Sequence, residues 1–171
     1  MDGRELSPAA RAAYTRLVGF VPQNPLLLPG TVADNVAFSR WGESYDRRDA
    51  EQACRQAALD FDLDRALGSG GGGLSGGQAQ RVVIARALFT RPDIIIFDEA
   101  TSALDQACEN IIAETIRNLP QTTTSIIIAH RLTTVEHCDT LVWLEKGRVL
   151  DYGPPAEILP RYQAGMLERR E

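Results

Sequence analysis

Short apolar runs rich in β-branched residues predict the strands of this chain. The runs IIIF (94–97) and III (126–128) are typical of strands buried on both faces of a parallel sheet. A shorter run, LVGFV (17–21), predicts another strand and leads into the proline-punctuated loop PQNPLLLPG. Residues 139–153 have the pattern of a hairpin that turns at Lys146 and Gly147.

Helices are predicted where apolar residues recur every three to four positions after a capping residue or a proline. Pro8 suits the first turn of a helix over 8–16, and Thr31 is a candidate N-cap. Further helices are expected over 46–59, 77–89 and 107–119, with a last one opened by Pro154 and Pro155. Alternating strands and helices imply an α/β fold with a parallel sheet and right-handed crossovers.

Composition and charge narrow the class of protein. The 171 residues are 44% hydrophobic and 24% charged, the balance of a globular protein, and the formal net charge is −5. This net charge argues against broad electrostatic binding to nucleic acid, but not against a local phosphate site. The three cysteines have no metal-ligand spacing and read as thiols in a reducing compartment. No apolar run approaches the ~20 residues of a membrane helix.

Polar residues follow three of the predicted strands. Asp98 and Glu99 follow the first buried strand, His130 ends the second, and Gln23 follows LVGFV. Ligands of parallel α/β sheets bind beyond the carboxyl ends of the strands. Asp98 could therefore hold magnesium, Glu99 could polarise a water, and His130 could donate to a phosphate. Each residue taken alone also fits a structural role at a strand end or in a loop.

The glycine-rich stretch GGGGLSGGQ (70–78) precedes the predicted helix 77–89. The amino terminus of a helix presents unpaired amides that bind phosphate, and glycines let the backbone approach an anion closely. Ser75 could cap the helix or donate its hydroxyl. The alternative is a flexible turn with a capping serine.

The order of these features resembles the ATP-binding cassette (ABC) ATPases, and most of all their exporter branch. Residues 18–36 resemble the glutamine loop of that family, LSGGQ (74–78) its signature motif, and IIIFDEATSALD (94–105) its Walker B strand and D-loop. IAHRLTTV (128–135) is similar to its switch histidine segment. The resemblance covers nearly the whole chain and implies a P-loop NTPase-like core with a small helical subdomain.

The resemblance also implies roles for single residues. Glu99 and His130 would be catalytic, and Asp98 and Gln23 would hold magnesium. Two cassettes would pack head to tail as a homo- or heterodimer, so that the signature of one contacts the ATP bound by the other. The implied nucleotide-contacting residues are Gln23, Ser75, Gly76, Gly77, Gln78 and Asp105.

The family pattern further implies an organisation and a location. Residues 1–25 would belong to the ATPase core, 26–90 to the helical subdomain, and 91–171 to the core again. The loop after Gln23 would contact a transmembrane domain, which places the chain at the cytoplasmic face of a membrane. An acidic residue that exporters carry shortly before LSGGQ is replaced here by SGGGG.

One expected element is not found in the sequence. No GxxxxGK[ST] stretch, which holds the β- and γ-phosphates in this family, occurs in residues 1–171. The chain therefore looks like the carboxyl-terminal three-quarters of a cassette, truncated at its amino terminus. Two functions remain open: the partial ATPase of an exporter, or a hydrolysis-incompetent fragment that acts as an interaction or nucleotide-sensing module.

Overall fold

The computed structural model describes residues 5–101, 104–129 and 131–168. The chain divides into two compact units, unit 1 up to Ile128 and unit 2 from Ala129. Unit 1 contains a three-stranded parallel sheet and the helices that pack on it, which confirms the predicted α/β class. Unit 2 contains an antiparallel hairpin and helices.

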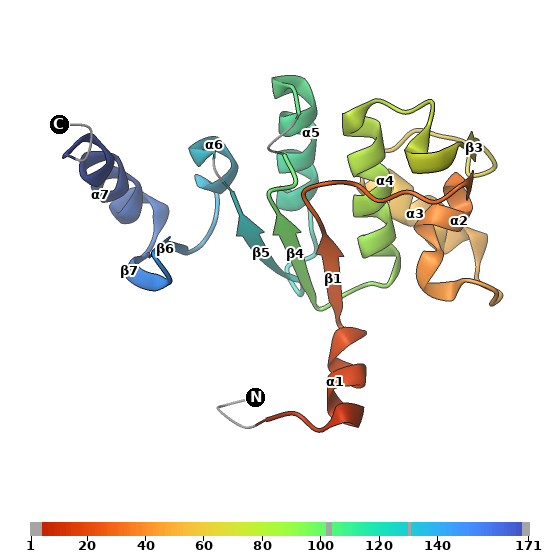
Figure 1. Cartoon of the computed structure of the whole chain (residues 1–171), viewed down its shortest axis with the longest axis horizontal. Helices are drawn as coiled ribbons and strands as arrows, with labels where there is room; N and C mark the ends of the chain where they lie inside the picture. Colours follow the sequence, from red (N-terminus) through yellow and green to blue (C-terminus); the bar gives the residue numbers. More distant parts are fainter. Residues whose placement is uncertain (1–4, 102–103, 130, 169–171) are drawn as a thin grey trace. The chain divides into compact units, whose positions relative to one another are not determined.

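The parallel sheet of unit 1 has the strand order β1 (Val18–Val21), β4 (Ile94–Asp98), β5 (Thr124–Ile128), as Figure 1 shows. Asp98 at the end of β4 is paired with Ile128 at the end of β5. The carboxyl ends of the strands therefore meet at one edge of the sheet. The predicted strands of this region are confirmed.

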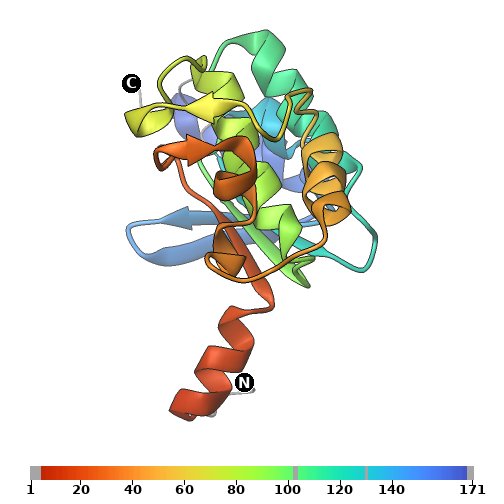
Figure 2. The ribbon, with the colours of Figure 1, turned by 90° about the vertical axis from the view of Figure 1, so that its right-hand side faces the viewer.

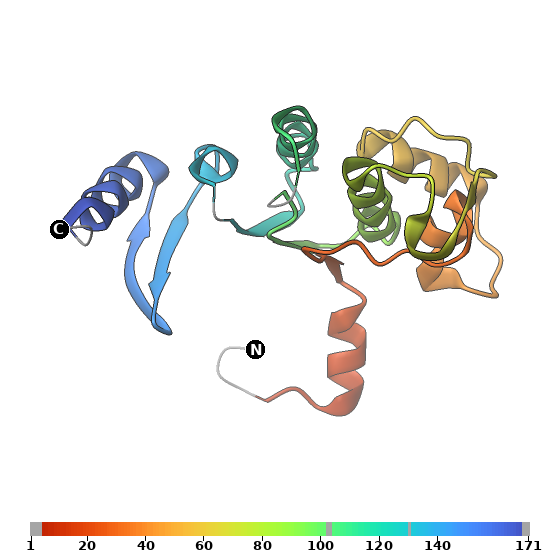
Figure 3. The same ribbon diagram turned by 45° about the horizontal axis from the view of Figure 1, so that its top comes forward.

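One face of the sheet forms the core of unit 1. Ile95 and Phe97 of β4 point into this core and are 0% and 1% exposed. The helices α4 (Gly76–Phe89) and α5 (Gln106–Arg117) lie on this side of the sheet, as Figure 3 shows. Nine residues of α4 are buried, so this helix is the centre of the core rather than a surface helix.

The opposite face of the sheet is largely open to solvent. Phe20 of β1 is 53% exposed and Ile126 of β5 is 47% exposed, although both are large apolar side chains. Burial of the strands on both faces was therefore a wrong prediction for β5, all of whose residues but one are exposed. The physical reason is that no described element of unit 1 packs over this face.

The segment between β1 and α4 folds into short elements around buried aliphatic side chains. Thr31 caps α2 as predicted, in a capping box with Asp34. Gly71, within the glycine-rich stretch, has a φ of +79°, and a Cβ there would lie 2.7 Å from Leu27 Cδ1. The positive φ thus favours glycine at this position. The elements are β2 (Gly30–Thr31), α2 (Val32–Val36), η1 (Phe38–Arg40), α3 (Arg47–Gln56), β3 (Ala66–Leu67) and η2 (Ser69–Gly71).

The first helix of unit 1, α1 (Pro8–Thr15), has Pro8 in its first turn as predicted, and the Ser7 side chain accepts from the Ala10 amide. It has no buried residues, and Figure 2 shows it extending away from the sheet beyond the start of β1. No helix in the described part of the chain is long and apolar enough to span a membrane.

In unit 2, the helix α7 (Pro155–Glu168) packs on the hairpin of β6 (Leu141–Glu145) and β7 (Arg148–Gly153). The ring of Trp143 meets that of Tyr162 edge to face at 5.2 Å between centroids. The hairpin turns at Lys146 and Gly147 as predicted, both with positive φ. The short helix α6 (Leu132–Val135) precedes the hairpin.

Candidate functional site

The structure brings Gln23 and Glu99 together at the carboxyl edge of the parallel sheet. The side-chain amide nitrogen Nε2 of Gln23 donates a 2.6 Å hydrogen bond to Oε2 of Glu99, although 76 residues separate them in the sequence. Asp98, the last residue of β4, lies next to Glu99 on the same edge. Three of the predicted strand-end polar residues therefore lie at one edge of the sheet.

The backbone of Glu99 has an unusual conformation. Its φ is +49°, in the left-handed region that glutamate rarely adopts. Its amide donates a 2.9 Å hydrogen bond to the carbonyl of Ile128, which anchors the residue to the end of β5. Strained backbone of this kind gathers at functional sites. The carboxylate is thus held at the sheet edge by main chain on one side and by Gln23 on the other.

The residues at this edge offer oxygen atoms of the kind that magnesium takes from proteins. Among the described residues, no group of three or more His, Cys, Asp or Glu side chains gathers to hold a metal ion. Magnesium usually takes one or two carboxylates from a protein and its other ligands from water and phosphate oxygens. The Asp98 carboxylate and the amide oxygen of Gln23 suit such a partial site.

A second cluster lies at the start of α4. The hydroxyl of Ser75 accepts a 3.2 Å hydrogen bond from the Gln78 amide, and Oε1 of Gln78 accepts one of 2.9 Å from the Ser75 amide. This capping box satisfies two of the amides that a helix start leaves unpaired. Gly76 between them is exposed, and the nearest atom to a Cβ placed there is Leu104 Cδ2 at 3.7 Å. Gly76 is therefore the exposed glycine of this helix start.

Gly77 serves a different purpose from Gly76. It is buried, and a Cβ on it would collide with the sulfur of Cys108 and lie 3.1 Å from the Cys108 Cβ. Cys108 is in the first turn of α5, so Gly77 is a point of close approach between α4 and α5. The sequence suggested close approach of an anion, whereas packing of these helices already requires glycine here.

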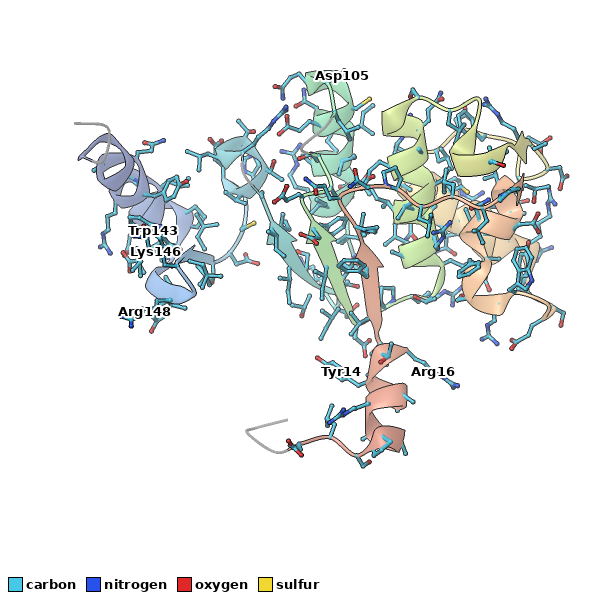
Figure 4. The ribbon with its side chains drawn as sticks, in the orientation of Figure 1. Tyr14, Arg16, Asp105, Trp143, Lys146 and Arg148 are labelled. Atoms are coloured by element: carbon cyan, nitrogen blue, oxygen red, sulfur yellow. The ribbon has the colours of Figure 1, made fainter. Side chains whose placement is uncertain are left out.

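Asp105 is the N-cap of α5 and lies near this helix contact. Its carboxylate accepts a 2.8 Å hydrogen bond from the Cys108 amide, and this bond is the main reason that the pKa of Asp105 lies below its usual value. Figure 4 shows Asp105 at the first turn of α5. Arg81 on α4 contributes to the same shift. Its Nε and Nη1 atoms are buried and find no hydrogen-bond partner among the described residues, so a positive charge lies close to the start of both helices.

One predicted site residue cannot be placed and others were missed. His130 lies outside the described residues. The sequence analysis did not single out Gln80 or Arg86, yet both are side chains of α4 that hold the segment after β1. Arg86 donates to the Leu26 carbonyl at 2.8 Å and to the Asn35 carbonyl at 2.7 Å. Burial lowers the pKa of Arg86. A polar residue on the apolar face of a helix was the available signal.

Comparison with known proteins agrees with this geometry. The family model described as ABC transporter matches residues 1–102. The chain is 43% identical over 166 residues to the ATP-dependent lipid A-core flippase of Yersinia pestis bv. Antiqua (strain Antiqua), covering 93% of this chain and 28% of that protein. It is 42% identical over 169 residues to the protein of that description from Salmonella typhimurium (strain LT2), covering 95% and 29%.

A solved structure shows the same fold. The structure of a bacterial Atm1-family ABC exporter with ATP bound matches with a TM-score of 0.83 and 35% identity, over 99% of this chain and 31% of the other. The chain therefore spans less than a third of the length of each of these relatives.

Proposed function

Because the chain belongs to the ABC transporter family, we propose that it forms the larger part of a nucleotide-binding domain that hydrolyses ATP to power an exporter. The observation that carries this proposal is the cluster of Gln23, Asp98 and Glu99 at the carboxyl edge of the sheet. If Glu99 had only a structural role, it would need neither its left-handed backbone nor the hydrogen bond from the side-chain amide of Gln23, which lies 76 residues away in the sequence.

Glu99 is the group that acts on water. Its carboxylate accepts a proton from, or orients, the water that attacks the γ-phosphate of ATP in line. Asp98 and the amide oxygen of Gln23 hold magnesium, which when bound neutralises charge on the phosphates. His130 donates a hydrogen bond to the γ-phosphate in this proposal, as the family resemblance implies. Gln23 has to turn its amide between Glu99 and the metal as the site fills.

The start of α4 serves a second nucleotide. Ser75, Gly76 and Gln78 present a helix amino terminus with an exposed glycine, which suits a terminal phosphate. The Ser75 and Gln78 side chains each accept a hydrogen bond from the backbone amide of the other residue, so the arrangement is preformed. We assign this end of α4 to an ATP bound by a second cassette in a head-to-tail dimer, with Asp105 at the same interface.

The organisation of the domain follows from these assignments. Residues 1–25 and 91–171 form the ATPase core in this proposal, and residues 26–90 form the helical subdomain. The loop after Gln23 contacts a transmembrane domain and places the chain at the cytoplasmic face of a membrane. Leu26 in this loop is 68% exposed, which suits such a contact.

A second function is favoured by one observation in the sequence. Residues 1–171 contain no GxxxxGK[ST], the loop whose amides and lysine hold the β- and γ-phosphates. A chain without that loop would contact or sense a nucleotide that a partner holds, but it would not hydrolyse that nucleotide.

The test is a comparison of two proteins. One is this chain as it stands, and the other is the same chain extended upstream by an apolar strand and a GxxxxGK[ST] loop. Titration calorimetry and phosphate release with magnesium-ATP are measured for both. ATPase activity in the extended protein, abolished by Glu99→Gln, supports the motor function. Nucleotide binding without turnover in the extended protein supports the sensing function.

A further inference from the structure

Gln80 is a polar residue on the buried face of α4. It is 2% exposed, and its neighbours on this face one turn later are Val83 and Ile84. Its Nε2 donates a 3.0 Å hydrogen bond to the carbonyl of Pro22, 58 residues earlier in the chain. A buried amide of this kind is costly unless it is paired, so the bond fixes the position of Pro22 relative to α4.

The Pro22 carbonyl belongs to the same planar peptide unit as the amide of Gln23. A peptide unit is rigid, so a bond that orients the carbonyl also orients the Cα of the next residue. Gln23 in turn reaches Glu99 with its side-chain amide. Hydrogen bonds therefore run from α4 to Pro22, and from Gln23 to Glu99, with one rigid peptide unit between them.

We propose that Gln80 is a positioning residue for ATP hydrolysis, and this inference rests on the proposed motor function. By holding the Pro22–Gln23 peptide unit, Gln80 sets where the Gln23 side chain meets Glu99. Gln80 is five residues beyond Ser75 on the same helix. When the start of α4 contacts the partner's nucleotide and α4 moves, the movement is passed through Gln80 and Gln23 to the Glu99 carboxylate of the same chain. The link thus couples the two halves of the split site.

The variant that tests the link is Gln80→Met in the complete two-cassette protein. Methionine has a similar volume and lacks the donor, so the core stays filled while the Pro22 carbonyl loses its bond. We expect kcat for ATP to fall about fivefold, the scale of one hydrogen bond, with KM changed by less than twofold. Thr90→Val is the matched control, because it removes another side-chain-to-backbone bond of α4, from Thr90 to the Ala87 carbonyl at 3.1 Å.

A double-variant cycle separates positioning from a general loss of packing. In a Gln23→Ala background the side chain through which Gln80 acts is gone, so Gln80→Met is expected to have no further effect on kcat. An equal fivefold loss in both backgrounds, or an equal loss from Thr90→Val, would overturn the proposal. The thermal midpoint of each protein is measured in parallel, since a purely structural role would lower it equally in both backgrounds.

A second readout does not depend on turnover. The side-chain amide resonances of Gln23 are recorded by NMR in the complete protein with and without Gln80→Met. A shift of these resonances supports the link even if the wild-type protein fails to hydrolyse ATP, in which case only the motor function is wrong. Unchanged Gln23 resonances overturn the link even if the wild type is an active ATPase.

Discussion

Gly77 of α4 and Cys108 of α5 are packed so tightly that the first carbon of any side chain at Gly77 would collide with the Cys108 sulfur. This contact joins the first turns of two helices whose starts both carry candidate site residues, Ser75 and Asp105. The neighbouring Gly76 differs, because a Cβ there would meet only Leu104 Cδ2, at an ordinary contact distance of 3.7 Å.

The first prediction concerns stability at these glycines. Gly77→Ala should destabilise the fold by about 1–3 kcal/mol through overpacking. Gly76→Ala should be neutral or stabilising, since alanine favours the helix and Leu104 lies at an ordinary contact distance of 3.7 Å. Urea unfolding monitored by circular dichroism measures both. Cys108→Ala combined with Gly77→Ala should restore most of the loss, and equal midpoints for the two single variants would contradict this account.

The second prediction places the effect of the signature segment (74–78) on the partner's nucleotide. Gly76→Asp is introduced into only one subunit of a two-cassette protein. The new carboxylate would repel the terminal phosphate at a site with little water to screen it, without the collision that Gly77→Asp would cause. Photo-crosslinking of labelled ATP should show normal binding to the mutated subunit's own phosphate loop. A defect confined to that subunit's own nucleotide would show that the site is not split.

The third prediction concerns Glu99 in a complete cassette. Glu99→Gln keeps the shape of the side chain and removes the base, so hydrolysis should fall about 100-fold or more. ATP binding should be retained, because none of the proposed phosphate contacts is removed. Phosphate release and equilibrium binding of ATP measure the two effects. Retained turnover would assign the base to another group, with His130 the next to be tested.

The fourth prediction follows from the buried thiol of Cys54. Burial raises the pKa of Cys54 to about 11, and the residue is 4% exposed. Since the folded state keeps the proton, this group favours folding below its unfolded pKa of about 8.5, and the effect is lost as the pH rises towards 11. In a variant that retains only Cys54, maleimide labelling should be slow at pH 8. Labelling in urea should be fast, and equal rates would contradict the burial.

The fifth prediction concerns the open face of the parallel sheet. Ile126 is 47% exposed on this face, and β5 is an edge strand of the described sheet, so the chain alone should self-associate. Ile126→Lys should raise the monomer fraction in size-exclusion chromatography with light scattering. The same change at Ile95, which is 0% exposed, should unfold the chain.

Sequence patterns correctly predicted features, such as helix caps and tight turns, that depend only on neighbouring residues. The cap at Thr31 and the turn at Lys146 and Gly147 depend on a few adjacent residues, and both were found as expected. The burial of β5 was mispredicted. An apolar run shows that a strand is suited to burial, but it does not show whether another element packs against that strand. Gln80 was missed because its partner is 58 residues away, and no spacing rule within a helix carries that information.

The left-handed backbone at Glu99 affects which residues selection would favour at position 99. A non-glycine residue there costs about 1–2 kcal/mol relative to glycine, and asparagine or aspartate would be tolerated more easily. In a library screened only for resistance to proteolysis, glycine and asparagine should displace glutamate at position 99. In a library screened for transport, glutamate should be retained at position 99 despite its cost in stability. The difference in the frequency of glutamate between the two screens then measures how strongly activity selects this residue.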